Sequence, residues 1–186
     1  MPFYLYDQPR RFVAGAVGQP GERSFYLQAS DGSRVTSVSL EKFQVSQLAE
    51  RLDELLDEVL RRTSGSATVP TAAPAALTDD GPLELPLLEE FRVGAIALAW
   101  DHDEQRVIIE AQQESDEPME PLTEDVPEDG PAVLRVRISA AAARAFSKRA
   151  LALVGQGRPP CPLCGLPLDV AGHICPRQNG HRVGHT

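Results

Sequence analysis

A pattern of three strands followed by a helix occurs twice in this chain, and it constrains the fold more than any other feature. The two halves can be aligned without a gap from the third strand through the helix. The matched pairs are Val35/Val133, Val38/Val136, Leu40/Ile138, Val45/Ala143, Leu48/Phe146, Arg51/Arg149, Leu52/Ala150, Leu55/Leu153 and Leu56/Val154. Self-similarity of this kind predicts an internal repeat. We therefore predict an α+β fold of two βββα repeats, with antiparallel sheet or sheets and two packing helices. A small C-terminal tail follows, and we expect it to be zinc-binding because it contains all three cysteines of the chain.

Local periodicity defines the elements of each repeat. Alternation of apolar and polar residues predicts strands, and apolar residues spaced three and four apart predict amphipathic helices. The expected strands cover residues 12–18, 24–30, 34–40, 91–100, 105–112 and 133–138, and the expected helices cover 41–62 and 140–154. Asp31-Gly32 is a typical hairpin turn, and Ser139 is a favourable N-cap. Two copies predict pseudo-twofold packing of two three-stranded antiparallel sheets, either separate or joined into one sheet or barrel, with both helices covering apolar faces.

Composition divides the chain into four parts. We assign residues 1–62 to the first βββα repeat, 63–88 to a Pro/Ala-rich linker, 89–157 to the second repeat, and 158–186 to the zinc-binding tail. The linker is expected to be flexible because it combines Ser, Gly, Ala and Pro. An acidic loop at 114–131 interrupts the second repeat, and its density of carboxylates predicts a solvated segment.

Net charge and cysteine content limit the classes of function. The formal net charge of −9 argues against non-specific binding to phosphate backbones. No apolar run resembles a signal peptide or a membrane span, so we expect a cytoplasmic protein with no membrane partner. Thiols stay reduced in that compartment, which favours metal binding over a disulfide framework for clustered cysteines.

The residues that carry chemistry are concentrated in the tail. Cys161-Pro-Leu-Cys164-Gly165 has the spacing with which a tight turn supplies two thiolates to zinc. His173 and Cys175 follow, and His181 comes five residues later. Two ligand sets remain open. One is Cys161, Cys164, His173 and Cys175, which we favour, and the other replaces His173 by His181 as the alternative ligand.

Several interpretations of this tail compete. Closed four-ligand zinc sites are usually structural, so the first expectation is structural Zn²⁺ that holds together a segment too small for its own core. A redox pair of Cys161 and Cys164 lacks the βαβ context of such motifs. Catalytic zinc would need a general base, and Asp169 is the only carboxylate in the tail. The remaining interpretation is a zinc-shaped surface that binds a partner.

The two ends of the chain resemble a known family. Tyr4-Leu-Tyr-Asp near the N-terminus, the stretch from Arg11 to Ala29, and Cys-Pro-x-Cys-Gly…Gly-His-x-Cys-Pro-Arg-x-Asn-Gly in the tail are similar to an actinobacterial family of short conserved proteins classed as a domain of unknown function. The resemblance covers nearly the whole chain and implies a cytosolic protein with a zinc-ribbon-like tail. The family tail often continues Asn-Gly-Tyr, which implies that His181 is not the family ligand and supports His173 with Cys175.

These observations favour a non-enzymatic interaction or adaptor module with a protein partner. No Ser-His-Asp or paired-carboxylate constellation stands out in the sequence. The first alternative is an enzyme or enzyme subunit with its active site in a groove between the repeats. The second is nucleic-acid binding through the tail, which the acidic composition disfavours.

Overall fold

The computed structural model describes residues 2–64, 68–115, 130–157 and 160–166, together with residues 168, 173, 175 and 177. The chain has a mixed α+β fold, as expected. Its elements are β1 (Phe3–Asp7), β2 (Arg11–Val17), β3 (Ser24–Asp31), β4 (Arg34–Leu40), α1 (Lys42–Arg62), a 3₁₀ turn η1 (Ala75–Leu77), β5 (Glu89–Asp101), β6 (Arg106–Gln113), β7 (Val133–Ser139) and α2 (Ala140–Gly155). The predicted strands and helices agree with these bounds within two residues.

The strands form one seven-stranded sheet in the order β1-β7-β6-β5-β4-β3-β2. Within each half the strands are antiparallel, whereas β4 and β5 pair in parallel and join the halves. The last strand of the first half therefore lies beside the first strand of the second, and the halves join into one sheet, which is one of the predicted arrangements. The duplication and its pseudo-twofold packing stay predictions.

The N-terminal strand β1 was not predicted. It pairs in parallel with β7, at the opposite edge of the sheet from β2. The sheet nevertheless curls enough to bring β1 near β4. The Tyr6 hydroxyl of β1 lies 2.8 Å from the Thr36 hydroxyl of β4. The guanidinium of Arg34 also lies 4.0 Å from the centre of the Tyr6 ring and donates to the Leu5 carbonyl. The N-terminus therefore fastens the two halves of the sheet to each other.

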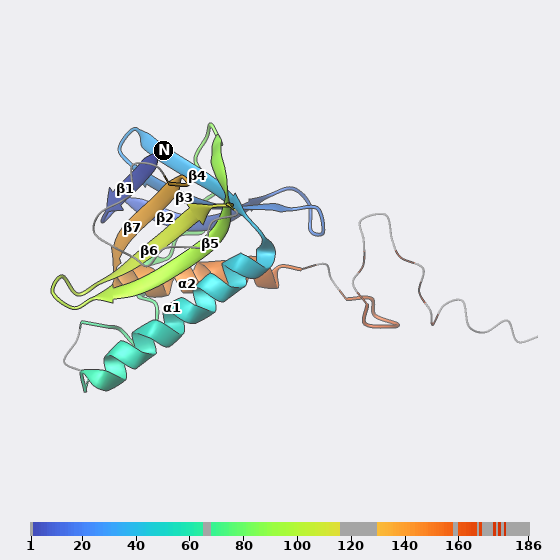
Figure 1. The fold of residues 1–186 in the computed structure, drawn as a ribbon. Coiled ribbons are helices and arrows are strands. Elements are labelled where there is room, and N and C mark those ends of the chain that lie inside the picture. Colours follow the sequence, from blue (N-terminus) through green and yellow to red (C-terminus); the bar gives the residue numbers. More distant parts are fainter. Residues whose placement is uncertain are drawn as a thin grey trace, which may run out of the picture.

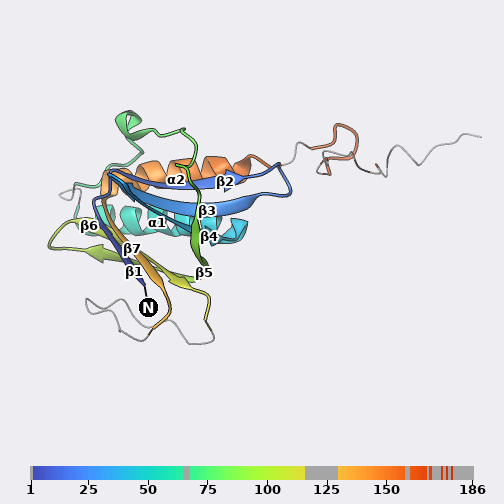
Figure 2. The same cartoon turned by 90° about the horizontal axis from the view of Figure 1, so that it is seen from above.

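Both helices lie on one face of the curled sheet and pack against each other (Figures 1 and 2). The apolar stripe predicted for α1 is buried there, including Leu52 and Leu56 at 0% exposure. Ser139 caps α2 by accepting a hydrogen bond from the Ala142 N–H at 3.2 Å. Arg144 of α2 is buried and pairs with Asp53 of α1 at 2.8 Å and with Asp57. The helices are thus joined by apolar contact and by a partly buried ion-pair cluster.

The segment between the halves is held to the body, unlike the flexible linker that we predicted. Asp79 accepts hydrogen bonds from Arg11 at 2.6 and 2.9 Å and from Arg149 at 2.9 Å. The backbone of Glu84 exchanges hydrogen bonds with the buried amide of Gln28, at 2.7 and 3.0 Å. A Cβ at Gly15 would lie 2.5 Å from the Leu83 side chain, so the glycine leaves room for the segment. Side-chain contacts from distant strands override the local composition here.

Candidate metal centre

The first part of the centre is the turn that begins at Cys161. The Cys161 N–H donates to the Leu166 carbonyl at 2.7 Å, and the Gly165 N–H donates to the Cys161 carbonyl at 2.8 Å. Gly165 has a φ of +74°, a left-handed conformation that glycine adopts without a steric cost. The Leu163 N–H points to the Cys161 Sγ at 3.4 Å. The loop therefore curls around its own sulfur atoms, as the Cys-x2-Cys-Gly spacing predicted.

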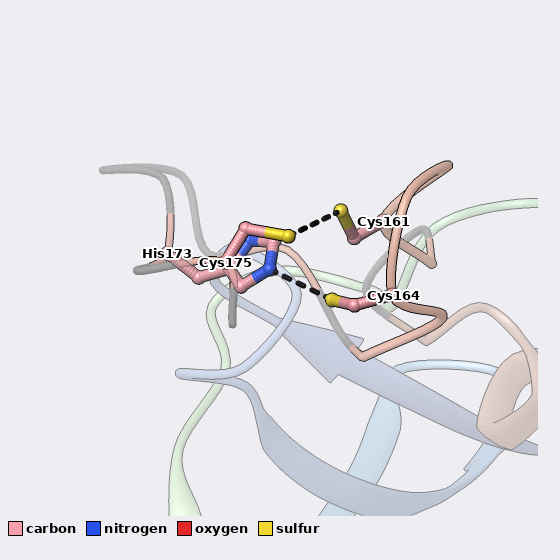
Figure 3. Close-up of side chains that lie close together, drawn as sticks. All are labelled: Cys161, Cys164, His173 and Cys175. Carbon is pink, nitrogen blue, oxygen red and sulfur yellow. Dashed lines mark hydrogen bonds between the residues drawn. The ribbon is translucent and has the colours of Figure 1, made fainter. Parts of the chain in front are cut away.

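The second part of the centre is supplied by His173 and Cys175, which face the turn (Figure 3). His173 Nε2 lies 3.2 Å from Cys164 Sγ, and Cys175 Sγ lies 4.0 Å from Cys161 Sγ. All four ligand atoms lie within 4.8 Å of one another. Tetrahedral zinc with bonds of about 2.3 Å to sulfur requires sulfur atoms roughly 3.8 Å apart. The cluster therefore has the dimensions of a site that could hold a metal ion.

Arg177 connects the two parts. Its guanidinium donates to the Leu163 carbonyl at 3.0 Å, across the cluster from its own segment. In the sequence this arginine directly follows the Cys-Pro pair of the tail. Its hydrogen-bond partner could not be predicted, because it depends on how the chain turns back.

The thiols differ in their protonation chemistry. Hydrogen bonds from the backbone N–H groups of Cys164 and Leu163 lower the pKa of the Cys161 thiol, because they stabilise the thiolate. A hydrogen bond from the Leu166 backbone by itself lowers the pKa of Cys164. Burial and the neighbouring thiols of Cys161 and Cys175 outweigh it, so that the pKa of Cys164 is raised. A divalent cation among the sulfur atoms would remove this conflict, since metal binding deprotonates coordinating thiols.

His173 presents Nε2 to the cluster, and its Nδ1 is buried without a hydrogen-bond partner in the described part of the chain. A ligating histidine usually donates its other ring nitrogen to a carbonyl or carboxylate. Because Nε2 faces the sulfur atoms, it is the ring nitrogen available to a metal. A metal bound to Nε2 would leave the ring proton on Nδ1.

Among the predicted residues, the structure brings together the first of the two ligand sets: Cys161, Cys164, His173 and Cys175. The alternative ligand His181 and the carboxylate of Asp169 lie outside the described residues. His102 is exposed at the hairpin between β5 and β6, where Asp101 accepts hydrogen bonds from two backbone N–H groups. That arrangement is an ordinary turn.

Comparisons with known proteins place the chain in a family. The family model described as "Protein of unknown function (DUF3090)" matches residues 4–175, and the chain therefore belongs to that family. The match ends at Cys175, the last member of the cluster. No curated protein and no solved structure matches the chain. Within the described residues, neither helix has the length and apolar character to cross a membrane.

Proposed function

We propose that the tail binds one Zn²⁺ through Cys161, Cys164, His173 and Cys175, and that the metal holds together a module for binding a protein partner in the cytoplasm. One observation carries the metal assignment: four soft donor atoms from two segments converge within 4.8 Å of one another. Three thiolates and one imidazole are a donor set that suits tetrahedral zinc better than magnesium or calcium, which prefer oxygen ligands.

The donor count favours a structural role for the zinc. Catalytic zinc keeps a coordination position open for water or substrate, whereas four protein ligands fill a tetrahedral site. No carboxylate of the described residues belongs to the cluster, so a general base beside the metal is also lacking there. The zinc would instead supply the folding free energy that so short a segment cannot obtain from a core.

Metal analysis of the purified full chain tests the site. Wild type should hold about one zinc ion per chain, and Cys161→Ser and His173→Ala should each lose most of it. His102→Ala is the matched control, because it removes an exposed histidine outside the cluster. His173→Cys should retain zinc, since Cys₄ is also a common structural set. Full zinc occupancy in both Cys161→Ser and His173→Ala would refute the assignment.

The contact surface for a partner would be the outside of the turn. Leu163 and Leu166 are each 50% exposed, although both lie beside the sulfur cluster. Their backbone groups are committed to the turn: Leu163 bonds Cys161 Sγ and Arg177, and the Leu166 carbonyl bonds the Cys161 N–H. The metal loop thus holds two apolar side chains at the surface, and exposed apolar groups rimmed by polar ones are typical of protein contacts.

A comparison of variants in a pull-down from the native cell tests the adaptor role. A specific partner should be captured by wild type and lost on Leu163→Ser/Leu166→Ser, provided that the double variant keeps its zinc. Leu88→Ser serves as the control, because Leu88 is 65% exposed in the segment before β5. A partner list that is identical for the double variant and wild type would exclude this surface.

A further inference from the structure

A polar cavity of about 620 Å³ lies at the opposite end of α2 from its capping residue Ser139. It is bounded by the β2–β3 turn, the adjoining ends of β3 and β4, the first residues of α1, the start of β5 and the last residues of α2. These elements meet where the halves join through β4 and β5 (Figure 1). Its volume is in the range of small-molecule sites, and it lies between elements of both halves, as such sites commonly do.

A row of polar side chains crosses three strands in this cavity. Tyr26 of β3 is directly opposite Ser39 of β4. Ser39 is in turn opposite Arg92 of β5, just past an irregularity in the β4–β5 register. Residues directly opposite one another in a sheet share a face, so their side chains are neighbours. All three line the cavity. The row therefore presents two hydroxyl groups and one guanidinium, all of which are hydrogen-bond donors.

Cationic groups flank the row. Arg23 and Lys42 also line the cavity, and Lys42 is the first residue of α1, at the positive end of the helix dipole. Arg23 donates to the Gln156 carbonyl at 3.0 Å, and Lys42 has no ion-pair partner among the described residues. Two carboxylates, Glu41 and Glu89, also line the cavity. The lining therefore has a formal excess of one positive charge, whereas the net charge of the whole chain is −9.

The carboxylates that pair with Arg92 are exposed to solvent. Arg92 pairs with Glu41, and its Nε lies 3.7 Å from Glu114. The side chains of Arg92, Glu41 and Glu114 are 57, 54 and 70% exposed. Exposed ion pairs contribute little free energy, because water screens the charges and side-chain entropy is lost. A dianion that accepts two parallel hydrogen bonds from the guanidinium could therefore displace these carboxylates from Arg92.

We infer that this cavity binds the phosphate group of a small organic phosphate. Arg92 would bind two phosphate oxygens through its planar fork, and Lys42 and Arg23 would supply point charges. The hydroxyl groups of Tyr26 and Ser39 would donate to the remaining oxygens. This site is separate from the Cys/His cluster, and its assignment does not depend on the metal.

Calorimetric titration of the zinc-loaded full chain with inorganic phosphate, and separately with adenosine 5′-monophosphate, tests the inference. Binding of either probe should be measurable below about 10 mM, and Arg92→Gln should weaken it at least about tenfold, as expected for charge-assisted hydrogen bonds. Arg61→Gln is the matched control, because Arg61 is an exposed arginine elsewhere on the molecule, paired with Glu58.

The outcomes are distinct. Binding that is lost in Arg92→Gln but kept in Arg61→Gln and Cys161→Ser supports a site at the row and independent of the metal. Absence of binding for both probes, or equal weakening by Arg92→Gln and Arg61→Gln, overturns the inference. Circular dichroism checks whether Arg92→Gln is folded. If it is not, Arg92→Lys replaces it, since this variant should keep the fold and bind the phosphate probes more weakly than wild type.

Discussion

Replacement of Asp79 by Asn should destabilise the protein at neutral pH, because this carboxylate holds the connecting segment to the body. Arg11 and Arg149 both donate to it, and their side chains are only 15 and 16% exposed. The hydrogen bond from Arg11 is the largest effect that lowers the pKa of Asp79, which falls from its ordinary 3.8 to about 2. Asn keeps the shape of the side chain but removes the charge.

The magnitude follows from linkage. A depression of this size corresponds to roughly 2.4 kcal/mol of stabilisation of the folded state. Asp79 is 34% exposed, so solvent screening reduces the expected loss to about 1–1.5 kcal/mol. Because the folded pKa is depressed, this contribution is present above pH ~4 and is lost as pH falls through ~2, with about half remaining near pH 3.

Urea denaturation at several pH values is the assay. The difference in unfolding free energy between wild type and Asp79→Asn should be largest at pH 7 and should shrink toward pH 3. Asp80→Asn is the matched control, because Asp80 is the exposed neighbour in the same segment. Equal stability of Asp79→Asn and Asp80→Asn at pH 7, or a difference that stays constant down to pH 3, would show that the clamp does not stabilise the fold as argued.

Two further substitutions probe the helices. Arg144→Ala should lower the free energy of unfolding by about 2–3 kcal/mol, because it leaves Asp53 unpaired at a helix interface where Arg144 is 6% exposed. Asp57→Asn should lower the free energy of unfolding by less than about 1 kcal/mol, because Asp57 is 70% exposed. Thermal unfolding of the two variants checks the order, and equal losses would contradict it. Ser139→Ala removes the N-cap of α2 and should lower the free energy of unfolding, measured by urea denaturation, by about 1 kcal/mol. The control Ser46→Ala, on the surface of α1, should change this free energy little.

Much of the fold could be predicted from local patterns. The strands and helices agree with the predicted bounds because alternation and helical periodicity reflect which side of each element is buried. Ser139 at the start of α2 and Gly165 after Cys164 could be predicted for a similar reason, since capping and left-handed turns depend on residues close in sequence. The Cys-x2-Cys spacing likewise predicted the turn of the candidate metal centre.

The connecting segment and the N-terminal strand could not be predicted in this way. Residues around Asp79 have the composition of a flexible linker, yet the guanidinium groups of Arg11 and Arg149, far away in sequence, hold them in place. Residues 1–11 carry too short a pattern to show that Phe3–Asp7 would pair with β7. In both cases the partner is distant along the chain, so no local window contains the interaction.

By itself, the sequence determined both α-helices and every strand except β1, and it limited the metal ligands to two sets that share all three cysteines. The tertiary structure decided that β4 and β5 join the halves in parallel, that β1 closes against β7, and that His173 faces the sulfur atoms of the turn. It also brought Tyr26, Ser39 and Arg92 into one row. Strand order and side-chain convergence depend on contacts between segments far apart in sequence, and those contacts form only when the sheet is assembled.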